Sequence, residues 1–227
     1  MAGGLGTRLR PLTYAIPKPL LPIGDRPILE ILLVQLARAG FTRVHVSTGY
    51  KGELIKSYFG DGHRFGLALE YVEEREPLGT AGALGLIRKK LAAPFLMVNG
   101  DILTRFEFGG FLTRHAASGA EFTAAAVRHE ITIPYGVIRG NGEAIDEVIE
   151  KPTETRLVLG GIYAATPAAL AHLPPAGGRV DVPEFIARII AAGGRVRHEP
   201  IDAFWMDVAK MDDFERARAE VATWDDV

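Results

Sequence analysis

Hydrophobic positions alternate between two spacings along the first half of the chain. Apolar residues recur at helical spacing over residues 28–39, 51–59 and 80–91, and Gly40 and Gly60 end the first two segments. Short apolar or β-branched runs, typical of strands, follow each other at residues 44–48, 67–72 and 95–99. Strands and helices in this order predict right-handed βαβ units and a mostly parallel sheet covered by helices on both faces.

The pattern changes after about residue 120. Strand-like runs at residues 122–127, 135–139, 145–150 and 158–164 are separated by short turns. Asn141-Gly142 between two of them indicates a hairpin. A helix over 182–192, a strand over 195–201 and a last helix over about 211–222 complete the chain. We expect one domain over 1–227, with an α/β half to about residue 120 and an α+β half on the same core.

Composition excludes several classes of protein. With 227 residues, of which 48% are hydrophobic, the chain has the make-up of a globular domain. It has no cysteine, which excludes disulfides, thiolate metal sites and a cysteine nucleophile. The net charge of −2 favours neither a nucleic acid polymer nor a membrane surface. Because the apolar stretches are short, no membrane span or secretory signal is predicted, and a cytoplasmic protein is expected.

The most informative stretch is the glycine-rich start of the chain. Residues 3–8 read GGLGTR, and its glycines allow backbone N–H groups to approach an anion closely. Thr7 and Arg8 add a hydroxyl and a fixed cation. The stretch is neither a Walker A loop, since no Gly-Lys-Ser/Thr follows, nor a dinucleotide fingerprint, since Leu9 stands where a third glycine is required.

A lysine bracketed by prolines follows this loop. Pro17 and Pro19 stiffen the backbone on either side of Lys18, so its ammonium is positioned with little loss of freedom. A solvated surface lysine needs no such bracket.

These residues form a recognisable signature. The run GGLGTRLRPLTYAIPKPLLPIGDRPILE closely resembles that of the sugar-1-phosphate nucleotidyltransferases. The resemblance extends over the whole chain through short motifs in the same order. They are PLGTAG (77–82), VNGD (98–101), PYGV (134–137), EKP (150–152), GIY (161–163) and WMD (205–207). It implies a Rossmann-like α/β fold with a mixed, mostly parallel sheet flanked by helices.

The resemblance also implies a reaction. A phosphate oxygen of a sugar 1-phosphate attacks the α-phosphorus of a nucleoside triphosphate, which yields a nucleoside-diphosphate sugar and pyrophosphate. The resemblance implies that Asp101, at the end of an apolar strand, and Asp207 bind Mg²⁺, an ion that usually takes one or two protein carboxylates. The position of Asp101 agrees with this role, because open α/β sheets bind ligands at the carboxyl ends of their strands. Three nearby acidic residues are not assigned to the metal: Asp202, Asp212 and Asp213. The last two are expected in the first turn of the final helix.

The remaining candidate residues take their roles from the resemblance as well. Arg8 is expected to hold the leaving pyrophosphate and Lys18 to neutralise the α-phosphate, which makes them the catalytic pair. Lys151 is expected on the phosphate of the sugar, with Glu150 on its hydroxyls. Two further sets are implied: nucleotide-binding residues Leu5, Gly6, Thr7, Glu76, Gly79, Thr80 and Gly82, and sugar-binding glycines Gly136 and Gly161. A salt-bridged pair is the alternative for Glu150 and Lys151.

The chain departs from the family pattern in three places. Leu159-Gly160 stands where relatives often have Asn-Ala, and Val208-Ala209-Lys210 stands where they have a small helix-entry run. The third departure is at the front. In this fold the glycine loop follows a buried apolar strand, but only Met1 and Ala2 precede it here. We therefore expect a first strand upstream of Met1, and an exposed apolar slot without it.

The motifs most closely resemble those of mannose-1-phosphate guanylyltransferase-like sequences, which favours GTP and mannose 1-phosphate as the substrates. Glucose-1-phosphate thymidylyl- or uridylyltransferases are the alternative. A catalytically silent subunit that senses sugar nucleotides is a rival from another class. Family members are commonly dimers or tetramers, so the resemblance also permits a homo-oligomer.

Overall fold

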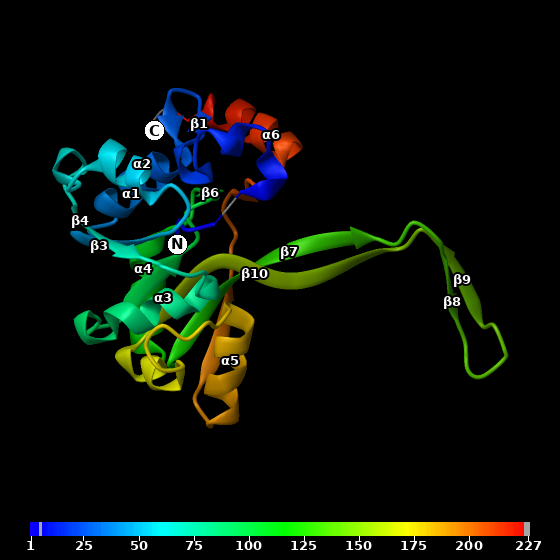
Figure 1. Ribbon diagram of the computed structural model, residues 1–227. Helices are drawn as coiled ribbons and strands as arrows, with labels where there is room; N and C mark the ends of the chain where they lie inside the picture. Colours follow the sequence, from blue (N-terminus) through cyan, green and yellow to red (C-terminus); the bar gives the residue numbers. More distant parts are fainter. Residues whose placement is uncertain (5, 225–227) are drawn as a thin grey trace.

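The computed structural model describes residues 1–4 and 6–224 (Figure 1). Its α-helices are α1 Ile28–Arg38, α2 Gly52–Phe59, α3 Gly79–Ile87, α4 Phe108–Ala117, α5 Val182–Ala191 and α6 Met211–Val221. Its strands are β1 Pro22–Ile23, β2 Arg26–Pro27, β3 Arg43–Thr48, β4 Ala68–Glu73, β5 Phe95–Val98, β6 Ile102–Thr104, β7 Phe122–Thr132, β8 Gly136–Arg139, β9 Glu147–Glu150, β10 Thr153–Ala165, β11 Val196–Pro200 and β12 Trp205–Asp207.

The centre of the fold is a four-stranded sheet in the order β11-β7-β10-β5. β11 pairs parallel with β7, whereas β10 is antiparallel to both of its neighbours. A separate parallel pair, β3-β4, lies beside it. The expected α/β fold with helices around a mixed sheet is confirmed. The described pairings are not mostly parallel, however, because β10 returns along β7 as the second leg of one long ribbon.

The helices expected at 28–39, 51–59, 182–192 and 211–222 are confirmed as α1, α2, α5 and α6. The expected helix 80–91 is shorter, since α3 ends at Ile87 and a 3-10 turn, Arg88–Lys90, follows. Helix α4 was not predicted. Gly109 and Gly110 in its first turn hide its apolar spacing, and the Glu107 carboxylate caps it by accepting hydrogen bonds from the Gly110 amide.

Three apolar clusters hold these layers together. The first packs the buried face of α1 (Leu29, Leu32, Leu33, Leu36) against β3, α2 and α4. The second packs α3 and α5 on the sheet around Phe122. The third joins Leu9 after the glycine loop, Leu103 of β6 and Met206 of β12 to α6. The third cluster therefore fixes the segments that carry Arg8, Asp101 and Asp207.

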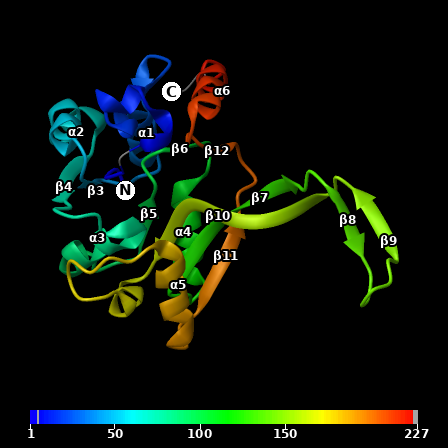
Figure 2. The same ribbon diagram turned by 45° about the vertical axis from the view of Figure 1, so that its right-hand side comes forward.

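Strands β7 and β10 are longer than the runs 122–127 and 158–164 predicted, and their outer halves leave the body as a two-stranded arm. The predicted hairpin is confirmed: β8 and β9 pair antiparallel at the end of the arm, and Gly142 in the turn has a φ of 65°. Figures 1 and 2 both show this hairpin projecting away from the helices. The outer halves were missed because they are polar and exposed, with no buried face to pattern them.

Within the described residues, no helix is both long enough and apolar enough to cross a membrane.

Two glycines of α3 differ sharply in their surroundings. A Cβ at Gly82 would lie 2.8 Å from the Gly178 carbonyl oxygen, which is backbone and cannot move aside cheaply. A Cβ at Gly85 meets nothing closer than 3.7 Å. Close approach of α3 to the 178–180 backbone therefore requires glycine at Gly82 and not at Gly85.

We expect Gly82→Ala to lower the free energy of unfolding by about 1–3 kcal/mol because the added methyl group overpacks this contact. Gly85→Ala, the matched control, should be neutral or stabilise by up to about 1 kcal/mol, since alanine is the better helix former. Urea unfolding measures both changes. Equal destabilisation by the two variants would contradict the packing argument.

Candidate active site

The glycine loop is held in shape by a buried threonine. Gly6 has a left-handed φ of 59°, and a Cβ there would lie 2.9 Å from Thr13 Cγ2. The Thr13 hydroxyl donates to the Gly6 carbonyl at 2.9 Å. The 3-10 turn Thr7–Leu9 follows and leaves Thr7 and Arg8 exposed. The structure thus forms a loop with an exposed arginine, and Thr13 is a supporting residue to which the sequence assigned no role.

Lys18 lies at the centre of the site. It begins a 3-10 turn directly after Pro17, and it is one of the few charged residues that are buried. Its Nζ lies 2.5 Å from Asp101 Oδ2 and 3.6 Å from Asp207 Oδ1. The structure therefore brings together three residues that lie far apart in the sequence.

A short strand pair brings the two carboxylates together. Asp101 follows β5 across Gly100, and β6 then begins at Ile102. β12 pairs antiparallel with β6 in a register that puts Asp207 opposite Ile102. The Val208 amide also donates to the Asp101 carbonyl at 3.2 Å. The position of Asp207 thus depends on a pairing between segments about a hundred residues apart, which no local pattern reveals.

The electrostatics of this group are unbalanced. Burial raises the pKa of Asp207, the Asp101 charge raises it further, and the positive charges of Lys18 and Arg8 oppose both effects. Asp207 Oδ1 is also a buried oxygen without a hydrogen-bond partner. A buried carboxylate oxygen without a hydrogen bond is costly, so the site favours a cation beyond the one that Lys18 supplies.

A polar pocket of about 210 Å³ opens beside this group. Its lining includes Gly4, Gly6, Thr7, Arg8, Lys18 and Asp101. No cluster of three or more His, Asp or Glu side chains suited to a metal occurs among the described residues. The donor set fits Mg²⁺ nonetheless, because this ion binds proteins through one or two carboxylates and takes its other oxygens from phosphates and water.

The nucleotide-binding residues expected on α3 have structural partners. Asp181 Oδ1 accepts from the Thr80 amide at 2.9 Å, and the Thr80 hydroxyl accepts from the Val182 amide at 2.8 Å. A Cβ at Gly79 would lie 2.6 Å from the Val180 carbonyl oxygen. Gly79 and Gly82 are therefore required by packing inside the protein, and their contact with base and ribose stays a prediction.

Leu5 and Glu76 are the residues expected to read the base. Leu5 lies outside the described residues, and Glu76 is exposed. Glu74, which the sequence did not single out, lies closer to the loop. Its Oε2 accepts from the Leu78 amide at 3.1 Å, and its Oε1 would be 3.2 Å from a Cβ at Gly3. Its position just after β4, at the end of a strand, is the signal that could have identified it.

Three of the sugar-binding candidates, Gly136, Glu150 and Lys151, form a second group away from the first. Gly136 pairs with Glu150 in the β8-β9 hairpin, and Lys151 follows with a φ of 45°. Lys151 Nζ lies 3.8 Å from Glu150 Oε1, and both side chains are largely exposed. The hairpin projects from the body in both views (Figures 1 and 2), so the structure does not bring Lys151 to Lys18.

Gly161 belongs to the body and not to the arm. It is buried at a register shift of β10, with a φ of 70°, and its carbonyl accepts from the Asn99 amide at 2.8 Å. A Cβ there would lie 2.8 Å from Asn99 Nδ2. Its place next to the end of β5 puts it near Asp101, and its contact with a sugar stays a prediction.

The structure gives Asp202 and Asp213 partners other than Lys18. Asp212 and Asp213 occupy the first turn of α6 as predicted, and Asp213 Oδ2 accepts from the Lys210 amide. Asp202 is exposed and lies 3.8 Å from Arg128.

Of the histidines, His115 is buried against the Thr123 hydroxyl, and burial lowers its pKa. Trp205 packs on the first cluster and donates its indole N–H to the Gly160 carbonyl.

Fold, glycine loop and paired carboxylates together define a nucleotidyltransferase domain. The chain belongs to the nucleotidyl transferase family, whose model matches residues 1–223.

Curated relatives resemble it over nearly its whole length. A mannose-1-phosphate guanylyltransferase of Mycobacterium tuberculosis is 35% identical, over 97% of this chain and 63% of that protein. A mannose-1-phosphate guanyltransferase of Schizosaccharomyces pombe is 33% identical, over 94% of this chain and 61% of that protein. The chain thus spans about three-fifths of the length of these relatives.

Solved structures confirm the fold. A putative glucose-1-phosphate thymidylyltransferase from Bacillus anthracis superposes with a TM-score of 0.78, at 22% identity, over 99% of this chain and 94% of that one. HddC from Yersinia pseudotuberculosis, complexed with GMP-PN, gives a TM-score of 0.72 at 23% identity, over 97% and 96% of the two chains.

A double-mutant cycle tests the charge arrangement without any ligand. Lys18→Gln leaves Asp101 and Asp207 facing each other, and we expect it to cost about 1–3 kcal/mol at pH 7, since both carboxylates are partly exposed. In the Asp207→Asn background the same change should cost at least about 0.5 kcal/mol less, because one repelling charge is gone. Urea unfolding of the four chains measures the coupling.

Lys56→Gln is the matched control for this cycle. Lys56 pairs with Glu73 at the surface, so its loss should cost less than about 1 kcal/mol. Strictly additive costs for Lys18 and Asp207 would show that the three charges do not act together.

Proposed function

We propose that the chain transfers a nucleotidyl group from a nucleoside triphosphate to a sugar 1-phosphate, with GTP and mannose 1-phosphate as substrates. Membership of the family supports the reaction, and the printed names of the relatives support this substrate pair. Because the chain spans about three-fifths of those relatives, both are proposals for this protein.

One observation carries the proposal: a buried lysine held between two carboxylates, beside a glycine loop that ends in an exposed arginine. A triphosphate needs cations close to it, and the pocket lining offers the Arg8 guanidinium and the Lys18 ammonium. The substrate supplies the nucleophile, so the protein needs to position two polyanions and neutralise their charge.

Each residue of the site has its own role in the transfer of the nucleotidyl group. The sugar-phosphate oxygen forms a bond to the α-phosphorus while the bond from the α-phosphorus to the bridging oxygen breaks, and pyrophosphate leaves with that electron pair. In this proposal Lys18, next to the glycine loop, neutralises charge on the α-phosphate, and Arg8 holds the leaving pyrophosphate. Asp101 and Asp207 would hold Mg²⁺, which neutralises triphosphate charge when bound.

The arm supplies the second substrate's contacts in this proposal. Lys151 and Glu150 offer a cation and an acceptor for the phosphate and hydroxyls of the sugar, and Gly136 beside them leaves room for a ring. They stand apart from Lys18, so the reaction requires the arm and the body to approach each other. A cytoplasmic location and a homo-oligomer, expected from the sequence, are part of the same proposal.

The proposal is tested by pyrophosphate release from four triphosphates against a panel of sugar 1-phosphates. We expect turnover with GTP and mannose 1-phosphate, its loss with a chelator and its return with Mg²⁺. Asp101→Asn should lower kcat by at least about 100-fold, since it removes a fixed charge from the reacting centre. Asp212→Asn, an acid in the first turn of α6, is the control and should stay within about twofold.

Turnover with a thymidine or uridine triphosphate alone would replace the proposed substrates. Absence of turnover with every pair, while a sugar nucleotide still binds, would favour the sensing subunit.

The role of the arm makes a separate prediction. Lys151→Met should raise KM for the sugar 1-phosphate by roughly 10- to 100-fold, the worth of a charge-assisted hydrogen bond, and leave KM for the triphosphate unchanged. Arg139→Gln removes a cation from the same hairpin and should change neither constant. Equal effects of the two variants would show that Lys151 acts only through the general charge of the arm and makes no specific contact with the phosphate.

A further inference from the structure

A short segment, residues 10–16, joins the two cations of the candidate site. Arg8 lies shortly before it and Lys18 shortly after it. Its side chains are exposed except for that of Thr13, whose hydroxyl donates to the Gly6 carbonyl. Because so little of the segment is buried, its own packing gives it low local stability, and other contacts must hold Arg8 and Lys18 at fixed places.

The turn directly after β3 supplies such contacts. The Lys51 ammonium donates to the Tyr14 carbonyl at 2.6 Å and to the Ala15 carbonyl at 2.9 Å. The Tyr50 hydroxyl donates to the Thr13 carbonyl at 3.3 Å. The three carbonyls follow one another at the end of a 3-10 turn, where a helical turn leaves acceptors without partners of its own. Two neighbouring side chains therefore hold the end of this turn.

The same turn also contacts the glycine loop. The Tyr50 amide donates to the Gly3 carbonyl at 3.5 Å, and a Cβ at Gly49 would lie only 2.9 Å from that oxygen. The close approach of the two backbones therefore requires glycine at position 49. The turn after β3 thus contacts the chain on both sides of Arg8: the loop before it and the segment after it.

The backbone conformation of Lys51 supports a role for its side chain. Its φ is 53°, and Lys51 is one of two non-glycine residues with a left-handed φ in the described part of the chain. This conformation is uncommon for lysine and persists where surrounding contacts hold it. Glycine would adopt it freely, so a lysine at this place points to the contacts that its ammonium makes.

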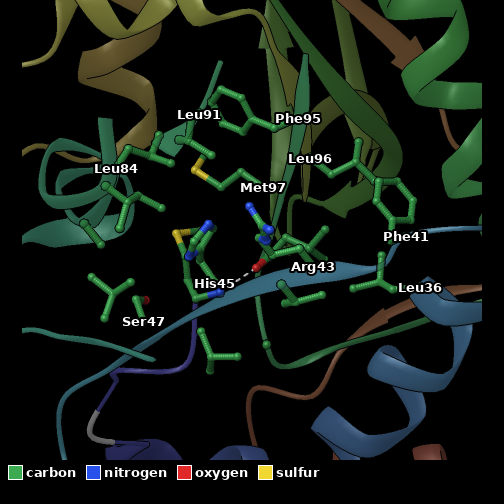
Figure 3. Close-up of a pocket in the computed structure, with 18 of the residues that line it drawn as sticks. Leu36, Phe41, Arg43, His45, Ser47, Leu84, Leu91, Phe95, Leu96 and Met97 are labelled. Carbon is green, nitrogen blue, oxygen red and sulfur yellow. Dashed lines mark hydrogen bonds between the residues drawn. The ribbon is translucent and has the colours of Figure 1, made fainter. Parts of the chain in front are cut away.

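Strand β3, which carries the turn, belongs to the packed body. It pairs in parallel with β4, and Val46 lies in the first apolar cluster. Figure 3 shows His45 and Ser47 of β3 along an apolar pocket, with Met97 of β5 above them in this view. The buried Ser47 and Thr48 lead directly into the turn. The turn is therefore the end of a well-anchored strand, which makes it a firm base for the exposed segment.

We propose that Lys51 and Tyr50 are positioning residues for the reaction: they tie residues 10–16 to the end of β3 and so fix Arg8 and Lys18 where the triphosphate binds. Neither residue lines the polar pocket, so they act through the segment and not on the substrate. Lys51 carries most of the effect, since its two hydrogen bonds have a charged donor. The inference rests on the proposed function for what the cations do, whereas the tie itself is tested without turnover.

Limited chymotrypsin digestion tests the tie. Tyr14 is 61% exposed, and the bond after it, which chymotrypsin would cut, contains a carbonyl that Lys51 holds. Lys51→Met should speed this cut at least about tenfold, the worth of a hydrogen bond to a charged group. Lys51→Arg keeps a charged donor and should stay within about threefold of the unchanged chain. Tyr50→Phe removes one neutral hydrogen bond and should speed the cut by about two- to fivefold.

Lys56→Met is the matched control, because Lys56 pairs with Glu73 at the surface, and its digestion rate should equal that of the unchanged chain. Mass spectrometry of the fragments gives the rate at each bond. Equal rates for Lys51→Met and Lys56→Met would overturn the proposal. An equal acceleration at bonds throughout the Lys51→Met chain would overturn it as well, since it would show general destabilisation and no local tie.

Kinetics test the effect on the site. In the pyrophosphate-release assay, Lys51→Met should lower kcat at least about tenfold and leave KM for the sugar 1-phosphate within about twofold, because misplaced cations act on the triphosphate. Lys51→Arg should recover at least about half of kcat, and Lys56→Met should leave it unchanged. A normal kcat in a Lys51→Met chain that is cut faster would overturn the inference and leave the proposed function standing.

Binding of the four nucleoside triphosphates with Mg²⁺ separates the inference from the proposed function. If the unchanged chain binds a triphosphate but shows no turnover, the proposed function fails. The inference then still requires that Lys51→Met raise the Kd of the tightest triphosphate at least about tenfold and that Lys51→Arg raise it less than about threefold. An unchanged Kd in Lys51→Met, or no binding of any triphosphate, would overturn the inference.

Discussion

The site depends on one arrangement of charge: the Lys18 ammonium, buried between the carboxylates of Asp101 and Asp207. Lys18 makes each carboxylate tolerable, and the two carboxylates make the buried ammonium tolerable. Without Lys18 two partly buried carboxylates would repel each other, and without them a buried ammonium would be unpaired. Asp207 remains the least satisfied member, with a raised pKa and a buried oxygen that accepts no hydrogen bond. With two carboxylates around one ammonium, the site is short of one positive charge, and it is therefore suited to an anionic substrate that arrives with a cation.

Apolar packing in the surrounding fold holds these three side chains in place. Leu9, Leu103 and Met206 belong to one cluster, so the loop with Arg8 and the strands next to Asp101 and Asp207 share a single packed base. The backbone also ties the site to the start of the chain, because the Gly100 amide, directly before Asp101, donates to the Met1 carbonyl. The arm differs from this body, since its residues are mostly exposed and its hairpin is held by its own ladder.

Most helices and inner strands could be predicted from the sequence, because each buries one regular face. The spacing of Leu29, Leu32, Leu33 and Leu36 gave α1, and the run ending at Asn99 gave β5. α4 could not be found in this way, since its glycines are poor helix formers and only the Glu107 cap and burial of Phe108 and Phe111 stabilise it. The outer arm could not be found either, because it has no buried face. The sense of β10 depends on its pairing with both β7 and β5, which no local pattern specifies.

For the candidate site, the sequence by itself determined the chemical groups: the glycine loop, Arg8, a lysine fixed by two prolines, and an aspartate at a strand end. Local backbone chemistry dictates these, since glycine and proline act on their own residues. Only the tertiary structure decided which groups meet. It put Asp207 beside Asp101 through the β6-β12 pair, made Gly79 and Gly82 packing positions, and set Lys151 apart on the arm. The physical reason is that contacts between distant segments depend on how whole layers pack, and a sequence pattern records only the face that each segment buries.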